Sequence, residues 1–232
     1  MECDKKEIIL IGTVHTDPLG AGSLYKWLLR LKPNIITVEI SPFSISYRKK
    51  MLFYWLKKLN EAKGSLRPKE RDHFQIQILY RSLLIPFEWV VSRAYAKNVS
   101  IPCIPIDIGE ISKKELPKWS KELISYFNLK LLVQQTDKDI VEFFDSKYKT
   151  ARKILFEKGN DFVFNLALNS KEFKKRDKVM AKKLLRFIKY KDKLVHVGGW
   201  QHLIITNKYS LVSLLEKNSK ENDIELKRIL LR

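Results

Sequence analysis

The sequence has few cysteines and no long apolar run, and these absences exclude disulfide-stapled and membrane-spanning proteins. The two cysteines, Cys3 and Cys103, have neither a C-x-x-C spacing nor the pattern of a disulfide framework, so we expect reduced thiols. The most apolar stretch, residues 83–91, is interrupted by Pro86 and Glu88 and is far shorter than the ~18 residues of a membrane span. The charged start of the chain leads directly into an apolar segment without a secretory signal, which predicts a cytoplasmic protein.

Acidic residues are scarce relative to basic ones. The chain of 232 residues has 26 Asp and Glu against 45 Lys and Arg, a net charge of +19, and the basic residues form short clusters such as residues 48–50 and 174–176. Such clusters attract anions, but charge alone has no specificity, and no signature of a nucleic-acid-binding module accompanies it. We interpret the lysines mainly as solvated helix faces, with a functional anion-binding surface as the alternative, and we disfavour nucleic acid as a partner.

Short β-branched runs alternate with helical patterns along the chain. With 45% hydrophobic residues the chain can bury enough apolar surface to offset its ordering entropy, which excludes intrinsic disorder. A first helix is predicted over residues 19–31 and another over 211–216, and alternating strands and helices favour an α/β fold with a mostly parallel, possibly mixed, central sheet. The predicted strands are residues 7–11, 34–40, 101–106, 193–197 and 224–231.

Two helical stretches are too long to be simple crossovers between strands. They fall at about residues 44–98 and 112–170, and we expect them to form a helical cap inserted between the strands of one domain that spans residues 1–232. The first is expected to split near residues 64–68 and to bend at Pro86.

Polar side chains stand just past four of the predicted strands. In parallel α/β sheets these ends meet at one edge, where ligands bind. Two imidazoles with one or two carboxylates are a ligand set for a divalent metal, and a carboxylate at the end of a buried strand needs a cation or donors nearby. The residues concerned are His15, Glu39, Asp107 and His202.

The predicted helix over residues 171–190 adds a charge pair beside an apolar stripe. The stripe of Phe173, Met180 and Leu184 passes through Asp177, and Arg176 borders it. The guanidinium could bind a substrate carboxylate or stabilise a developing oxyanion. A structural ion pair with a carboxylate of the fold is the equal alternative.

The other two histidines are weaker candidates. His196 lies inside a predicted strand and is expected to pack or bond to a neighbouring strand, and His73 is expected on a polar helix face. The sequence has no His-Glu-x-x-His, Gly-x-Ser-x-Gly, phosphate-binding loop or Gly-x-Gly-x-x-Gly, which removes the standard zincin, serine hydrolase, P-loop and Rossmann interpretations.

Four segments follow one another along the chain in a recognisable order. They are Gly12-Thr13-Val14-His15, Ile36-Thr37-Val38-Glu39, Arg176-Asp177-Lys178-Val179-Met180-Ala181 and Val197-Gly198-Gly199-Trp200-Gln201-His202. In this order they resemble the superfamily of TraB/PrgY and TIKI proteins, which includes GumN-like proteins and, more distantly, erythromycin esterases and the ChaN haem-binding lipoproteins. The resemblance implies an α/β fold in which both Gly-x-x-His segments, the Glu and the Arg line one cleft, and in the TIKI branch a divalent-metal-dependent peptidase activity.

The chain departs from that superfamily at two points. Members often have an arginine soon after the glutamate, whereas here the nearest is Arg48, nine residues on. Trp200 and Gln201 stand where small residues are usual, which predicts a narrower cleft.

These observations predict a metal-dependent, peptidase-like hydrolase of a peptide or small-molecule substrate. A divalent ion such as Mn, Co or Zn would be held by His15, His202 and Glu39. In a variant of this scheme Glu39 is the general base and the two histidines are the only ligands. Arg176 would bind the substrate carboxylate or stabilise the oxyanion. The alternatives are a non-catalytic protein that binds a small signal, peptide or haem, nucleic-acid binding through basic helices, and an Fe(II) oxidase. Supporting or substrate-binding roles are predicted for Asp107, Gly12, Gly199 and Asp177.

Overall fold

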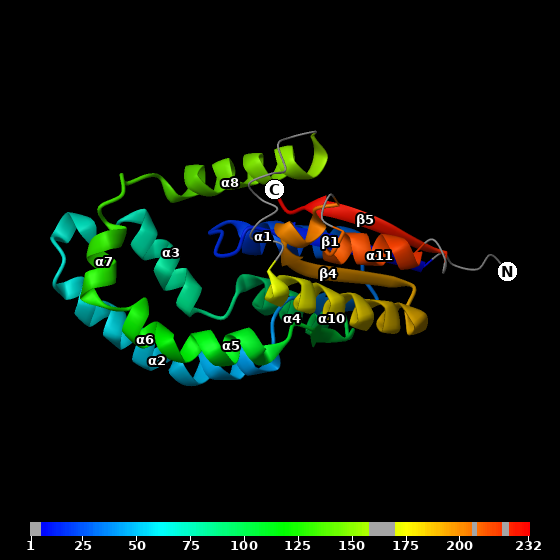
Figure 1. The fold of residues 1–232 in the computed structure, drawn as a ribbon, viewed down its shortest axis with the longest axis horizontal. Helices are drawn as coiled ribbons and strands as arrows, with labels where there is room; N and C mark the ends of the chain where they lie inside the picture. Colours follow the sequence, from blue (N-terminus) through cyan, green and yellow to red (C-terminus); the bar gives the residue numbers. More distant parts are fainter. Residues whose placement is uncertain (1–5, 158–169, 206–207, 220–222) are drawn as a thin grey trace.

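The computed structural model describes residues 6–157, 170–205, 208–219 and 223–232, and this part contains a five-stranded sheet in which all the strands are parallel. β4, from late in the chain, lies beside β1 (Figure 1), and the strand order β3-β2-β4-β1-β5 places it between β1 and β2. The α/β fold predicted from the sequence is confirmed. The strands are β1 (Lys6–Thr13), β2 (Ile35–Val38), β3 (Cys103–Pro105), β4 (Lys193–Gly199) and β5 (Ile224–Leu230).

The register of the sheet sets the two Gly-x-x-His segments side by side. Gly12 of β1 lies opposite Gly198 of β4, and Thr13 lies opposite Gly199. β1, β2 and β4 are buried along nearly all of their length, as expected for strands covered on both faces.

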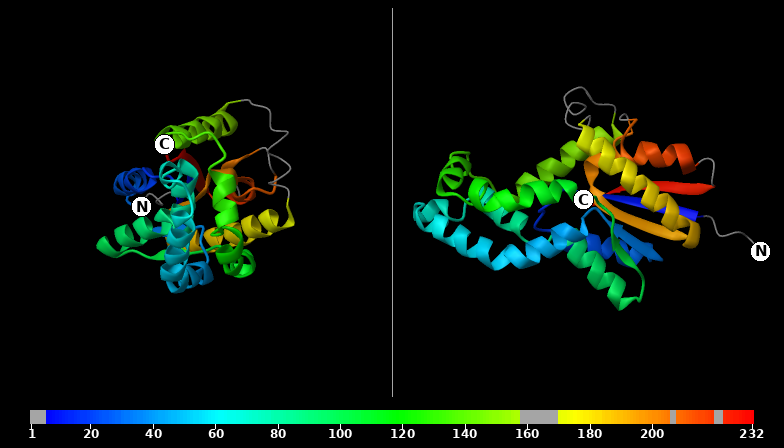
Figure 2. Two further views of the ribbon diagram at one scale, coloured as in Figure 1. Left: turned by 90° about the vertical axis from the view of Figure 1, so that its left-hand side faces the viewer. Right: turned by 60° about the horizontal axis from the view of Figure 1, so that its bottom comes forward.

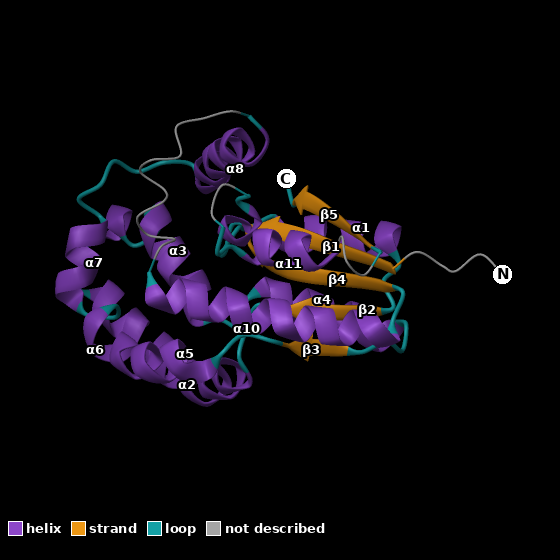
Figure 3. Cartoon of the chain, turned by 45° about the vertical axis from the view of Figure 1, so that its right-hand side comes forward, coloured by secondary structure: helices purple, strands orange, loops and turns teal. Residues whose placement is uncertain are grey.

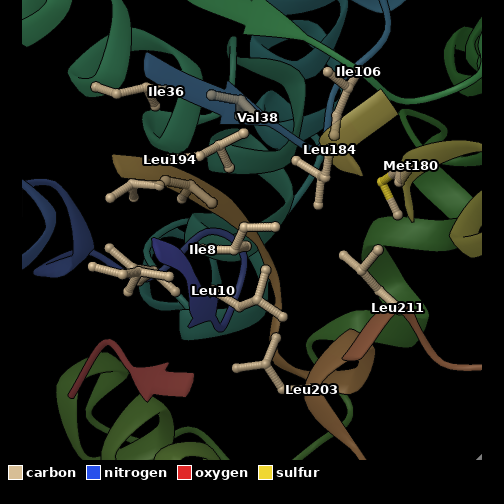
Figure 4. Packing of buried hydrophobic residues seen from close by; sticks show 14 of the residues in the cluster. Ile8, Leu10, Ile36, Val38, Ile106, Met180, Leu184, Leu194, Leu203 and Leu211 are labelled. Carbon is tan, nitrogen blue, oxygen red and sulfur yellow. The ribbon is translucent and has the colours of Figure 1, made fainter. Parts of the chain in front are cut away.

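Helices cover both faces of the sheet (Figure 3). On one face α1 (Gly20–Leu31) packs against α4 (Phe87–Asn98), and on the other α10 (Lys171–Phe187) packs against α11 (Leu211–Ser219). α8 (Ile140–Phe156) lies beside β5. Apolar side chains of α10 and α11 join those of the strands in one core (Figure 4).

A second group of helices extends past the carboxyl ends of the strands, and we call it the cap (Figure 2). It has a small apolar core of its own, in which Trp55 and Leu129 are fully buried. α4, at the end of the first predicted insertion, also contacts β2 and β3. The cap consists of α2 (Pro42–Gly64), α3 (Phe74–Leu83), α5 (Gly109–Glu115), α6 (Trp119–Glu122) and α7 (Tyr126–Leu132), with the short 3-10 helices η1 (Pro68–Glu70) and η2 (Leu116–Lys118).

Local sequence signals set where the helices of the first predicted insertion begin and end. The hydroxyl of Ser41 accepts a bond from the backbone N–H of Ser44 (3.0 Å) and caps α2. At Pro86 the structure has a break rather than the expected bend, because α3 ends at Leu83 and Pro86 is the N-cap of α4.

The expectation that His73 lies on a polar helix face is wrong. Its side chain is buried, caps α3 by accepting a bond from the backbone of Gln75, and donates from Nε2 to the carbonyl of Gln135 (2.9 Å). The imidazole serves as a structural link between α3 and the segment after α7.

No helix in the described ranges is both long enough and apolar enough to cross a bilayer. Cys3 lies outside these ranges.

Candidate functional site

The ends of three parallel strands, β1, β2 and β3, border a cavity of about 630 Å³ under the cap. His15 follows β1, Glu39 follows β2 and Asp107 follows β3, and all three line the cavity together with Arg176 of α10. His202, in the 3-10 helix η4 (Trp200–Leu203) after β4, lies behind Glu39. The structure therefore brings together the residues that the sequence analysis selected.

The carboxylate of Glu39 is the central acceptor of the site. Its Oε1 accepts from Nη2 of Arg176 (2.5 Å) and from Nε2 of His202 (3.0 Å), and its Oε2 accepts from the backbone N–H of Gly199 (2.7 Å). Burial alone would raise the pKa of this carboxyl, but the charges of His202 and Arg176 hold the pKa well below its usual range. Glu39 is therefore an anion with both oxygens already bonded.

His202 lies between two carboxylates and carries a positive charge. Its Nδ1 bonds Asp177, its Nε2 bonds Glu39, and the ring of Phe173 stacks on it with centroids 4.5 Å apart and planes at 3°. Burial would lower the pKa of His202, but Glu39 and Asp177 raise it to about 10. The fully buried Asp177 is held in turn by the backbone N–H of Leu211 (2.7 Å).

Arg176 joins the ends of β2 and β3. Its Nε and Nη2 donate to the two oxygens of Asp107 (2.9 and 2.8 Å) in a fork-like pair, while Nη2 also reaches Glu39. These carboxylates outweigh burial and raise the pKa of the guanidinium, which stays charged. Its Nη1 makes no hydrogen bond within the described part of the chain, so one donor nitrogen is free for a ligand. Asp107, for which a supporting role is predicted, orients Arg176.

His15 is held by a carboxylate that the sequence analysis did not select. Its Nδ1 donates to Oε1 of the buried Glu88 (2.7 Å), which also accepts from the hydroxyl of Thr13 (2.8 Å). Desolvation by the surrounding protein is the largest single influence and lowers the pKa of His15, but the charge and the hydrogen bond of Glu88, together with the charge of Glu39, outweigh it and raise the pKa. The side chain is 54% exposed, and among the described residues Nε2 has no hydrogen-bond partner. Glu88 was detectable as the one charged residue in the apolar stretch at 83–91.

Two close approaches explain why glycines precede His202. A Cβ on Gly198 would lie 2.7 Å from Oε2 of Glu39 and 3.0 Å from Nε2 of His196, and one on Gly199 would lie 3.1 Å from Nε2 of His15. His196 bonds Thr37 of the neighbouring strand (3.0 Å), as expected, and burial lowers its pKa to about 4, so it is neutral. Gly12 has a different role, because its missing Cβ lets the backbone of Trp200 approach.

The predicted metal ligands fit an ion only in part. His15 and His202 each have Nδ1 held by a buried carboxylate, an arrangement common around metal-bound histidines. Both oxygens of Glu39 are already occupied, however, and Nε2 of His202 donates to Glu39 rather than facing an empty space. Among the residues that the structure describes, no three His, Cys, Asp or Glu side chains stand together as a ligand set. Metal binding by His15, His202 and Glu39 stays a prediction.

Comparison with known proteins found no matching family model, no matching curated protein and no matching solved structure. The resemblance to the TraB/PrgY and TIKI superfamily therefore stays a prediction.

The charged state of His202 predicts a pH-dependent stability. Because its folded pKa of about 10 lies above the ordinary value near 6.5, its contribution is complete below that ordinary value and is lost as the pH rises through about 10. In chemical denaturation, the difference in unfolding free energy between the native protein and His202→Gln should shrink across this window by up to about 1.4 kcal/mol per pH unit. A difference that stays constant with pH would contradict an imidazolium at this position.

The contact between Gly198 and Glu39 predicts a steric test of the site. Gly198→Ala should destabilise the protein by about 1–3 kcal/mol, because the new methyl group must displace a carboxylate held by three donors. Gly22→Ala in α1 is the matched control: nothing lies within 4 Å of its added Cβ, so the change should be below about 1 kcal/mol. Calorimetric melting of both variants measures the difference, and equal effects would show that Gly198 has space.

Proposed function

We propose that the protein is a hydrolase that uses His15 to activate water for attack on an ester or amide carbonyl. The observation that supports this is the His15–Glu88 pair. Glu88 binds Nδ1–H of His15 and so fixes the tautomer in which Nε2 has the free lone pair. That nitrogen belongs to a side chain that is half exposed and lines the cavity. This is how a carboxylate orients a catalytic imidazole.

The buried state of Glu88 adds to the argument. Its Oε2 is buried without a hydrogen-bond partner within the described ranges, which is costly for a carboxylate. Such a cost is common where a charge serves catalysis, because an imidazolium that forms at His15 during the reaction is stabilised by the full anion beside it.

Arg176 supplies the second requirement of acyl transfer, a donor for the oxyanion. Glu39 and Asp107 hold the guanidinium rigidly from two sides, and its free Nη1 belongs to a residue that lines the same cavity as His15. A preorganised cation of this kind stabilises the negative charge that develops on a carbonyl oxygen. Glu39 acts as a positioning residue in this scheme, since its low pKa and occupied oxygens make it a poor general base.

The reaction then proceeds in two proton transfers. His15 takes a proton from water as the water oxygen bonds to the carbonyl carbon, and the carbonyl oxygen becomes an anion beside Arg176. When the bond to the leaving group breaks, the imidazolium returns this proton to the departing oxygen or nitrogen. The products are an acid and an alcohol or amine, and the imidazole is restored.

Metal-dependent hydrolysis at the same residues is the second candidate, and the carboxylate-held Nδ1 atoms of His15 and His202 favour it. A divalent ion would supply an acidified water there. Titration with Mn, Co and Zn distinguishes the two schemes. Our scheme predicts hydrolysis that persists in a chelator and equal ion binding by wild type, His15→Ala and His202→Ala. Loss of activity in the chelator, with ion binding weakened in both variants, would replace it with the metal-dependent scheme.

The base role of His15 predicts a specific pH profile. Because Glu88 raises the pKa of His15, kcat/KM for a 4-nitrophenyl ester should increase with pH through a limb above 6.5. Glu88→Gln keeps an acceptor for Nδ1–H but removes the charge, so the limb should move to lower pH. His15→Ala should reduce kcat/KM by about 10²–10⁴-fold.

The matched control is His73→Gln, which removes a buried imidazole outside the cavity and should leave the profile unchanged. If the pH dependence of kcat/KM were the same in Glu88→Gln as in the native protein, His15 would not be the general base. A protein that binds ligands in the cavity but hydrolyses no ester or amide would be a sequestering protein instead.

A further inference from the structure

The cap lines its side of the cavity with apolar and neutral polar side chains and with two guanidinium groups, but with no carboxylate among the described residues. Ile78 and Leu79 of α3, with Trp119 of α6, line it together with Arg48 of α2 and Arg81 of α3. Both arginines are partly buried, and burial of a charge is costly unless an anion compensates for it.

Arg48 has hydrogen-bond acceptors but no acidic partner. Its Nη1 donates to the carbonyl oxygens of Ser82 and Leu84 (2.9 Å for the latter), and its Nε donates to the hydroxyl of Ser44 (3.2 Å). The guanidinium also stacks 4.7 Å from the ring centroid of Trp119. Within the described ranges no carboxylate lies at ion-pair distance from it, and Nη2 has no partner. Burial lowers the pKa of Arg48 to about 10, while the charge of the more distant Glu88 acts in the opposite direction.

The acidic groups of the cavity are already neutralised elsewhere. Glu39 and Asp107 pair with Arg176, and Asp17 pairs with Arg232 (3.0 Å). Arg81 makes no side-chain ion pair in the described part of the chain. The cap end of the cavity therefore has an uncompensated positive charge, whereas each carboxylate that lines the strand end has a cationic partner.

We propose that Arg48, assisted by Arg81, binds an anionic group of the substrate, a carboxylate or a phosphate, at the cap end of the cavity. The free Nη2 can donate to an oxyanion, and the apolar side chains around it suit a hydrocarbon or aromatic body. Arg176 has a different role, because Glu39 and Asp107 occupy its Nε and Nη2 and its Nη1 serves the oxyanion in the proposed reaction. This inference deepens the proposed function: the substrate is an ester or amide whose other end is acidic.

Binding of three small probes tests the proposal without turnover. Phenylacetate and phenyl phosphate have the same aromatic body as the neutral phenylacetamide, and isothermal titration calorimetry measures each against the full-length protein. We expect at least one of the two anions to bind more tightly than phenylacetamide. The anion that binds more tightly shows whether the site takes a carboxylate or a phosphate. Equal affinity for all three probes would overturn the proposal.

Charge-removing variants assign the site. Arg48→Gln should weaken anion binding by about tenfold or more, the loss of one charge-assisted contact, and leave phenylacetamide unaffected. Arg81→Gln removes a charge but no side-chain hydrogen bond within the described ranges, so this variant should stay folded even if Arg48→Gln does not. It should weaken anion binding by less than Arg48→Gln does. Arg93→Gln is the matched control, because Arg93 stacks on Trp89 outside the cavity and is exposed. An equal loss in Arg93→Gln would show a general charge effect and refute the site.

Kinetics separate this inference from the reaction on which it rests. The native protein should hydrolyse 4-nitrophenyl hydrogen glutarate with a higher kcat/KM than 4-nitrophenyl butyrate, and Arg48→Gln should remove that preference. Equal hydrolysis of both esters would refute the anion site and support the hydrolase. If neither ester is hydrolysed but Arg48→Gln still loses anion binding, the anion site is supported and the hydrolase is refuted.

Discussion

The buried carboxylate of Glu39 determines how the rest of the site is organised. It stands directly after β2, accepts from the backbone of the adjacent β4, and bonds cationic side chains of η4 and α10. Burial of one carboxylate costs several kcal/mol, and this is offset only when every oxygen is bonded. The network is therefore cooperative: each of its members is satisfied only while the others stay in place.

The same network determines which groups remain available for chemistry. Positive and negative groups alternate through it, from Asp177 to His202, Glu39, Arg176 and Asp107, so that every charge in it faces an opposite charge. His15 and Glu88 form a separate pair, of which His15 lines the cavity. One imidazole is thus immobilised as a structural cation, while the other keeps a free nitrogen. Two similar Gly-x-x-His segments end in different chemical states because of the carboxylates that face them.

The sequence predicted the strands and the strand-end residues well, because both depend on local patterns. A β-branched run that ends in a carboxylate identified Glu39, and a charge within an apolar helical stripe identified Asp177. Glu88 could not be paired with His15 from the sequence, since 73 residues separate them and only the packing of α4 against the sheet joins them. The sequence did not distinguish Arg48 from the other two members of its basic cluster, Lys49 and Lys50, which are exposed. Which of three neighbouring cations faces a cavity depends on helix rotation, and composition does not report it.

The position of β4 in the sheet has a consequence for biosynthesis. β1 and β2 emerge first from the ribosome, yet each has its hydrogen-bonded neighbour in β4, which begins at Lys193. A nascent chain that stops short of this strand has β1 without either of its partners, because β5 follows β4, and has β2 paired with β3 on one side only. It also lacks His202 and the N–H of Gly199, which bond Glu39. Completion of the sheet must therefore wait until β4 has been made, which lengthens the interval in which unpaired strand edges are exposed and delays assembly of the site.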